Sequence, residues 1–127
     1  MSNFPEKSEY FGPGLWFAIH TLARLAIDDK SIEYFIMFMK DLEKSLPCSI
    51  CRENHYKPYL KSNPLHKDLL KADYKGRKNF GVFYWTWNFH NAVNKRLRKK
   101  EISIEDAVKI YYVEVSDNIS VCQSCGK

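Results

Sequence analysis

Helical spacing of apolar side chains is the strongest constraint on the fold of this chain of 127 residues. Over most of its length these residues recur three or four positions apart, which places them on one face of an α-helix. The pattern, with a proline suited to the start of a third helix, predicts helices over residues 13–27, 31–46, 47–59, 82–98 and 103–115. Residues 60–79 are polar and interrupted by Asn63-Pro64 and Gly76, so we expect a loop there, with at most a helical turn around Leu69.

Local signals set the expected ends of these helices. The first helix is expected to open at Pro13 or Gly14, and Ser31 is a candidate cap for the second. Ser103 begins a capping-box pattern ahead of the last helix. The aromatic run over residues 80–87 also suits a strand, but the polar residues that follow it favour a helix.

One domain accounts for the chain. Its hydrophobic content of 45% is enough for a single compact core, which we place in residues 1–116, with a flexible tail over residues 117–127. No apolar stretch approaches the roughly 20 residues of a membrane span. The first ten residues also lack the apolar core of a secretory signal, so we expect no membrane span and no cleaved leader.

The chain is basic, with a formal charge of +5 and a pI of about 9.0. Such a charge is compatible with nucleic acid, an anionic membrane surface or a phosphate-bearing ligand. Much of the excess is clustered at the end of an aromatic helix, in Lys95, Arg96, Arg98, Lys99 and Lys100. The clustering favours a local anionic ligand over a broad nucleic-acid interface. We therefore expect no nucleic-acid partner. The alternative is a solvated helix end stabilised by the helix dipole.

Four cysteines form two pairs of identical spacing, Cys48/Cys51 and Cys122/Cys125. Without a leader, this pattern indicates metal binding or redox chemistry before structural cross-linking. Cys48 and Cys51 lie in the expected first turn of a helix, with both sulfurs on one side and close enough for a disulfide. The helix N-terminus stabilises a thiolate there, which suits repeated oxidation and reduction.

The alternative for the cysteines is a tetrahedral zinc site made by Cys48, Cys51, Cys122 and Cys125, in a basic adaptor that binds nucleic acid or protein. Residues 52–121 separate the two pairs, whereas zinc ribbons more often separate them by about 15 to 20 residues. No glycine-bearing turn surrounds Cys48 to shape a metal knuckle. Redox chemistry is therefore favoured, and no metal is expected, but the spacing alone leaves zinc open.

Two histidines share helix faces with partners suited to a planar ligand. Trp16 precedes His20 by four residues, and Asn94 follows His90 by four. A lone histidine among apolar neighbours is usually a core residue with one hydrogen bond. Two such faces together, however, are able to sandwich a heteroaromatic ring.

Three blocks of sequence carry a resemblance to a known family. They are Gly12-Pro13-Gly14-Leu15-Trp16-Phe17-Ala18-Ile19-His20, Leu46-Pro47-Cys48-Ser49-Ile50-Cys51 and His90-Asn91-Ala92-Val93-Asn94-Lys95-Arg96-Leu97. In this order they resemble the Erv/ALR family of FAD-linked sulfhydryl oxidases, over about residues 11–115. The compact chain is most similar to the minimal members from large cytoplasmic DNA viruses. The resemblance implies an all-α fold, a four-helix bundle with a short fifth helix that holds FAD at one end.

The resemblance also implies a cofactor site. Trp16 and His20 would contact the flavin region, while residues on the fourth helix would hold the adenosine part and the pyrophosphate. The full expected set is Gly12, Trp16, His20, Trp87, His90, Asn91, Asn94, Lys95, Arg98 and Lys99. Many cellular relatives have a further disulfide near the fourth helix, but this chain has no cysteine at Trp87 or around Ser103, so packing must replace it.

The implied activity is disulfide formation in protein substrates. Electrons would pass from a dithiol to Cys48/Cys51, then to FAD and to O2, with release of H2O2. We expect Cys51 to be the sulfur nearer the flavin and Cys48 to exchange with substrate. Cys122/Cys125 would act as a shuttle that relays electrons to the core pair, or alternatively pin the tail.

Partners and location follow from the same resemblance. The expected substrates are protein dithiols or a thioredoxin-like carrier, and the expected assembly is a homodimer formed through the first two helices. If the source is viral, the host cytoplasm, viral assembly sites or the virion are the expected locations; otherwise a soluble intracellular protein is expected. There the enzyme would form disulfides against a reducing glutathione pool.

Overall fold

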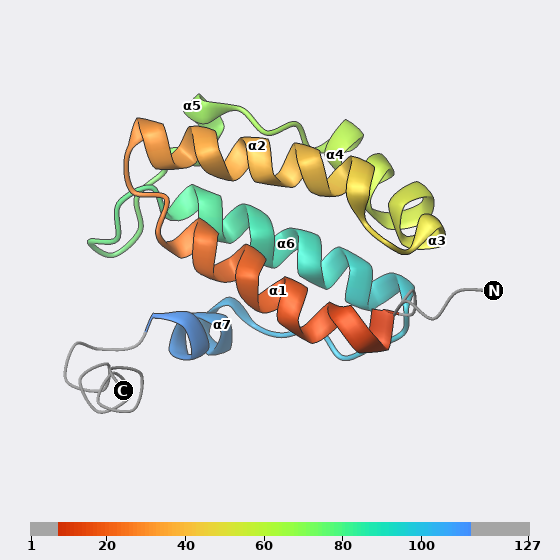
Figure 1. Cartoon of the computed structure of the whole chain (residues 1–127). Helices are drawn as coiled ribbons and strands as arrows, with labels where there is room; N and C mark the ends of the chain where they lie inside the picture. The colour runs from red at the N-terminus through yellow and green to blue at the C-terminus, as the bar shows by residue number, and fades with distance from the viewer. Residues whose placement is uncertain (1–7, 113–127) are drawn as a thin grey trace, which may run out of the picture.

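The computed structural model describes residues 8–112, and this part of the chain folds into helices. In Figure 1 the long helix α6 (Phe80–Arg96) lies between the long helices α1 (Ser8–Arg24) and α2 (Asp29–Ser45). The elements are α1 (Ser8–Arg24), α2 (Asp29–Ser45), α3 (Ser49–Cys51), the π-helix η1 (Arg52–Tyr56), α4 (Lys57–Ser62), α5 (Lys67–Leu70), α6 (Phe80–Arg96) and α7 (Ile104–Tyr111). Within these residues, extended pairing is limited to one bridge between Tyr74 and Arg77. The predicted all-α fold is confirmed.

Helix α6 forms the centre of the core. Its buried side chains include Val82, Phe83 and Phe89, which are fully shielded from solvent. Helix α1 packs along α6, and Phe35 of α2 and Trp85 of α6 form a T-shaped pair, with ring centroids 6.3 Å apart. The apolar helix faces that the sequence predicted thus converge on one helix.

None of the helices in residues 8–112 is long and apolar enough to span a membrane.

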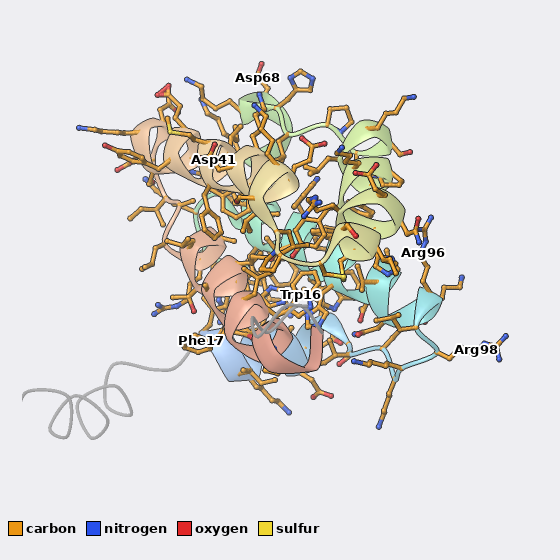
Figure 2. The ribbon with its side chains drawn as sticks, turned by 45° about the vertical axis from the view of Figure 1, so that its right-hand side comes forward. Trp16, Phe17, Asp41, Asp68, Arg96 and Arg98 are labelled. Carbon is orange, nitrogen blue, oxygen red and sulfur yellow. A yellow bond between two sulfur atoms is a disulfide. The ribbon has the colours of Figure 1, made fainter. Side chains whose placement is uncertain are left out.

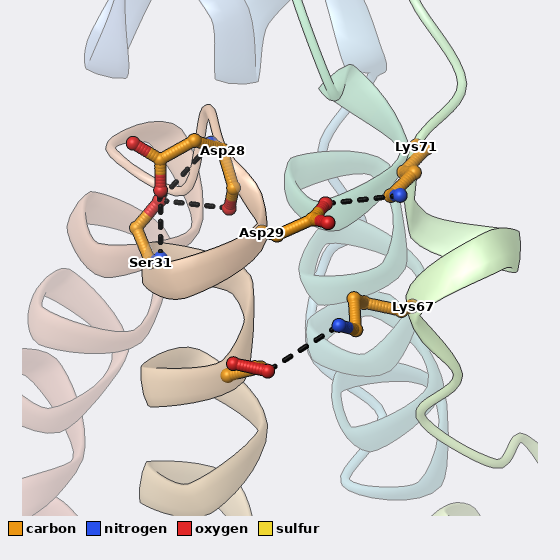
Figure 3. Close-up of polar contacts among 6 residues, drawn as sticks. Asp28, Asp29, Ser31, Lys67 and Lys71 are labelled. Atoms are coloured by element: carbon orange, nitrogen blue, oxygen red, sulfur yellow. Dashed lines mark hydrogen bonds and ion pairs between the residues drawn. The ribbon is translucent and has the colours of Figure 1, made fainter.

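The start of α2 differs in detail from the prediction. Asp28, and not Ser31, is the N-cap: its carboxylate accepts a hydrogen bond from the Ser31 backbone N–H at 2.8 Å. The Ser31 hydroxyl accepts one from the Asp28 N–H in return, which completes a capping box. Figure 3 shows this cap beside an ion pair between Asp29 and Lys71, at 2.9 Å. A second exposed pair, between Lys67 and Glu33, also joins α5 to α2.

The predicted limits of the first helix were wrong at both ends. α1 begins at Ser8, so Pro13 lies inside it and not at its start. A proline in the second turn removes one backbone hydrogen bond near the helix end, where the loss is small enough for the helix to continue. At the other end α1 stops at Arg24, because Leu25, Ala26 and Ile27 form the turn that leads to the Asp28 cap. Ile27 is consequently exposed and does not face the core.

The third predicted helix starts two residues later than expected and contains a π-turn. Cys48 is the N-cap, and the helical segment runs from Ser49 to Ser62 through α3, η1 and α4. The predicted turn around Leu69 is present as α5 within an otherwise irregular stretch. The strand alternative for residues 80–87 is wrong, because this run lies in α6. Residues 113–115 of the last predicted helix, and the predicted tail, lie outside the described residues.

Hydrogen bonds tie α6 to the segment before α7, where cellular relatives were expected to have a disulfide. Trp87 donates its indole N–H to the Ile102 carbonyl at 2.7 Å. The Asn91 side chain donates to the same carbonyl at 2.8 Å and accepts the Ile102 N–H at 3.0 Å. Three polar contacts therefore assist the packing that the sequence was expected to rely on here.

Candidate functional site: a disulfide beside an aromatic cavity

Cys48 and Cys51 form a disulfide at the start of the third helical segment, with Cα atoms 5.2 Å apart. The Cys51 backbone N–H donates to the Cys48 sulfur at 3.1 Å. A hydrogen bond to sulfur at a helix N-terminus stabilises the thiolate formed when the disulfide opens. Around the pair, Ile50 is 66% exposed and Ser49 is also exposed. The disulfide therefore lies where another protein can approach.

A cavity of about 590 Å³ opens on the inner side of this disulfide. Cys51 lines it, whereas Cys48 does not. The other walls include flat side chains from four helical elements, α1, η1, α6 and α7: Trp16, Tyr56, His90 and Tyr111. Its volume lies within the range of cofactor pockets, which are commonly about 300–1,000 Å³.

Stacked rings form one wall of the cavity. The rings of Trp16 and His90 lie nearly parallel, at 7°, with centroids 3.9 Å apart. Phe89 meets Trp16 edge to face at 5.2 Å. Figure 2 shows Trp16 turned toward the interior of the bundle, whereas its neighbour Phe17 lies toward the outside. The stack fixes the planes of the Trp16 and His90 rings, because a tilt of either ring would break the stacking contact between them.

His20 lies behind this wall, buried between α1 and α6. Its Nε2 is 2.9 Å from Nδ1 of His90, and its own Nδ1 is 2.9 Å from the Thr86 hydroxyl. Burial, and then the charge of His90, lower the pKa of His20 to about 3. Burial, and then the charge of Lys99, lower the pKa of His90 to about 4. Both imidazoles are therefore neutral at physiological pH.

His55 is a cavity residue that the sequence analysis did not identify. It follows Cys51 by four residues within the π-turn η1 and lines the same cavity. Its Nδ1 is buried and has no hydrogen-bond partner within residues 8–112. Burial, and then the charge of Arg96, lower the pKa of His55. Because π-turns are frequent at functional sites and a buried unpaired nitrogen is costly, both features mark His55 as a candidate ligand contact.

The structure brings half of the expected cofactor residues to the cavity wall. These are Gly12, Trp16, His90, Asn94 and Lys99. His20 stands behind them and reaches the cavity through His90.

The other four expected residues have different surroundings. Trp87 and Asn91 direct their polar groups to Ile102, and Lys95 and Arg98 are exposed and do not line the cavity. Figure 2 shows Arg98 extending away from the body of the molecule.

Comparison with known proteins places this arrangement in a family. The sequence model of the Erv1 / Alr family matches residues 13–113. The chain belongs to the Erv1 / Alr family. It is 36% identical over 109 residues to an FAD-linked sulfhydryl oxidase of African swine fever virus, covering 80% of each chain. A second isolate's FAD-linked sulfhydryl oxidase is 33% identical over 117 residues, covering 87% of each.

A plant relative extends the comparison beyond viruses. Sulfhydryl oxidase 1 of Arabidopsis thaliana is 25% identical over 115 residues, which cover 91% of this chain and 20% of the plant protein. The Erv1 / Alr assignment agrees with the resemblance inferred from the three sequence blocks. The zinc-binding alternative gains no support, since Cys48 and Cys51 are bonded to each other. In addition, no group of three or more potential metal ligands occurs in the described part of the chain.

Proposed function

We propose that this chain is an FAD-dependent sulfhydryl oxidase that forms disulfide bonds in protein substrates. The observation that carries the proposal is that Cys51, half of an accessible disulfide, lines an aromatic-walled cavity of cofactor size. Relatives that carry the name FAD-linked sulfhydryl oxidase support the same activity. When bound, FAD supplies the two-electron chemistry that links thiol oxidation to an electron acceptor.

The residues of the cavity fit a flavin nucleotide. Trp16, Tyr56 and His90 provide flat surfaces for stacking. A Cβ added at Gly12 meets no protein atom within 4 Å, so the backbone leaves open space at this wall. The unpaired Nδ1 of His55 offers a hydrogen bond to a ligand, and Lys99 supplies a positive charge for the pyrophosphate.

The two cysteines divide the work between substrate and cofactor. A substrate thiolate attacks the Cys48 sulfur, the Cys48–Cys51 bond breaks, and a mixed disulfide forms at Cys48. The second substrate thiol then displaces Cys48. The substrate loses two electrons and two protons, and the enzyme pair gains them as two thiols. The Cys51 N–H stabilises the Cys48 thiolate as it leaves, and the place of Cys51 on the cavity wall supports its role beside the flavin.

Oxygen uptake with dithiothreitol tests this function. The purified protein should be yellow, consume O2 and release H2O2, and Cys51→Ser should bind FAD but lose oxygen uptake. Ser49→Ala is the matched control, because Ser49 is exposed between the cysteines and takes no part in the exchange. Oxygen uptake that persists in Cys51→Ser would contradict the proposal.

The C-terminal cysteine pair is proposed to relay electrons from protein substrates to Cys48/Cys51. Cys122 and Cys125 lie outside the described residues, so the support is their spacing alone. Truncation before Cys122 should keep activity toward dithiothreitol and lose activity toward a reduced protein or a thioredoxin-like carrier. Equal activity of the truncated and full-length chains toward the protein substrate would indicate that the pair only holds the tail.

A viral setting and a homodimer complete the proposal. The African swine fever virus relatives support a viral source, and hence action in the host cytoplasm, at assembly sites or in the virion. The exposed apolar side chains Phe17, Tyr34 and Met37 on α1 and α2 support a dimer interface there. Met37→Lys should shift sedimentation from dimer to monomer, whereas Lys40→Ala, on the same helix, should not. A wild-type monomer would exclude the dimer.

A further inference from the structure

A chain of hydrogen bonds runs from the cavity wall to the backbone of α6. It joins His90, His20, Thr86 and the Phe83 carbonyl in that order. Thr86 and His20 are both buried, and the cavity does not reach either of them. We propose that Thr86 is a positioning residue: its hydroxyl fixes the tautomers of His20 and His90, so that His90 presents a hydrogen-bond acceptor to the bound nucleotide.

The direction of the chain follows from the single hydrogen of the Thr86 hydroxyl. This hydroxyl donates to the Phe83 carbonyl at 2.7 Å. A carbonyl only accepts, so the hydrogen is committed, and toward His20 the Thr86 oxygen is able only to accept. Nδ1 of His20, 2.9 Å away, must therefore carry the hydrogen of that ring.

The two neutral imidazoles pass this constraint to the cavity. A neutral ring has one N–H, so His20 with hydrogen on Nδ1 has a bare Nε2 that accepts. His90 Nδ1, 2.9 Å from it, must then be the donor, and this leaves His90 Nε2 as an acceptor. Among the side-chain hydrogen bonds of residues 8–112, His90 takes part through Nδ1 alone, in the bond to His20. The low pKa values of both histidines support the neutral forms that this count requires.

An acceptor on the cavity wall selects for a donor on the ligand. This step rests on the proposed function, in which the cavity binds FAD, whose hydroxyl, amino and ring N–H groups are able to donate. The hydrogen bond between His90 Nδ1 and His20 Nε2 would be lost if the His90 ring flipped, so this bond keeps Nε2 as the free nitrogen, while the stack on Trp16 holds the plane of the ring. The opposite tautomers would place an N–H at the same point and disfavour such a donor. Thr86, which does not touch the ligand, thereby sets the polarity of the site through two rings.

Replacement of the hydroxyl tests the proposal. Thr86→Val keeps the shape of the side chain and removes the oxygen, whereas Thr86→Ser keeps the oxygen. ¹⁵N NMR of the histidine rings reports which nitrogen carries hydrogen. We expect Nδ1–H on both His20 and His90 in the wild type and in Thr86→Ser, and loss of this pattern in Thr86→Val. FAD should bind about 3- to 10-fold more weakly to Thr86→Val, the range for one lost hydrogen bond, and Thr86→Ser should restore the affinity.

The outcomes of this experiment distinguish failure of the Thr86 proposal from failure of the proposed function. Hydrogen on Nε2 of both rings in the wild type would overturn the proposal, as would unchanged tautomers and FAD affinity in Thr86→Val. If Thr86→Val fails to fold, the wild-type and Thr86→Ser spectra still decide the direction of the chain. Failure of the wild type to bind FAD would instead overturn the proposed function, because the tautomers are measurable without the nucleotide.

Discussion

Mild acid should destabilise this protein through its buried histidines. His20 and His90 remain neutral in the folded state, with pKa values lowered to about 3 and about 4. In the unfolded chain they titrate near the ordinary value of about 6.5. Between these values the unfolded state binds more protons, so the free energy of unfolding falls as the pH falls. The stabilising contribution is complete above pH 6.5 and is lost progressively below it.

The size of the effect follows from the two pKa values. Each pH unit below the unfolded pKa costs about 1.4 kcal/mol for each histidine that stays neutral in the fold. Between pH 7.5 and 5.5 we therefore expect a loss of about 1.4 kcal/mol from His20 and a similar loss from His90. Over this window carboxylates remain ionised in both states, because their ordinary pKa values lie near 4. The lowered pKa of His55 adds to the same trend.

Urea denaturation of the FAD-loaded protein at pH 7.5, 6.5 and 5.5 measures this dependence. His20→Gln removes one titrating group, so its free energy of unfolding should fall by about 1.4 kcal/mol less than that of the wild type between pH 7.5 and 5.5. Asn88→Gln is the matched control, because Asn88 is exposed and its amide does not titrate over this pH range. If His20→Gln and the wild type lose the same free energy over this range, the assignment of a neutral, buried His20 is wrong.

Three further predictions concern the cavity wall and the frame around it. Gly12→Leu should reduce the amount of FAD that stays bound through gel filtration, because Gly12 lines the cavity. Gly14→Leu, at an exposed position of the same helix, should retain FAD. Equal retention by the two variants would argue against a ligand at this wall. Asn91→Ala leaves the Ile102 N–H without its acceptor and should cost about 1–3 kcal/mol in urea denaturation, whereas the exposed Asn88→Ala should cost little. Similar losses in the two variants would show that the contacts between Asn91 and Ile102 contribute nothing. Asp28→Ala removes the cap of α2 and should lower stability by about 1 kcal/mol, seen as a lower melting temperature, and an unchanged melting temperature would show that the cap is dispensable.

Local sequence signals were sufficient to predict those features of the fold whose contacts lie within one helix. Apolar residues at helical spacing identified the long helices, because this periodicity is a property of each helix alone. The Cys48/Cys51 pair was placed correctly at a helix start for the same reason. The errors fell at the ends of elements: Pro13 was read as a start although one missing hydrogen bond is tolerated inside α1, and Ser31 was read as the cap although Asp28 competed for that place.

The residues expected at the cofactor show the limit of prediction from local sequence patterns. Asn91 and Trp87 were expected at the cofactor, yet their polar groups point to Ile102, a residue that no local pattern connects to them. His55 was missed because its position depends on a π-turn, which moves a side chain around the helix axis relative to regular α-helical spacing. The position of His55 four residues after Cys51 was a signal that the sequence contained. This spacing alone, however, does not distinguish a histidine that contacts a ligand from one on the surface.

The sequence alone predicted the long helices, the place of Cys48 and Cys51 at a helix start, and the family. Each of these depends on residues close together in the chain or on motifs kept in order. The tertiary structure decided which of these residues meet. His20 on α1 reaches His90 and Thr86 on α6 only because the two helices pack at one particular rotation about their axes. Successive side chains around a helix differ in direction by about 100°, so a small change in that rotation would replace every partner in the chain of hydrogen bonds while leaving the sequence pattern intact.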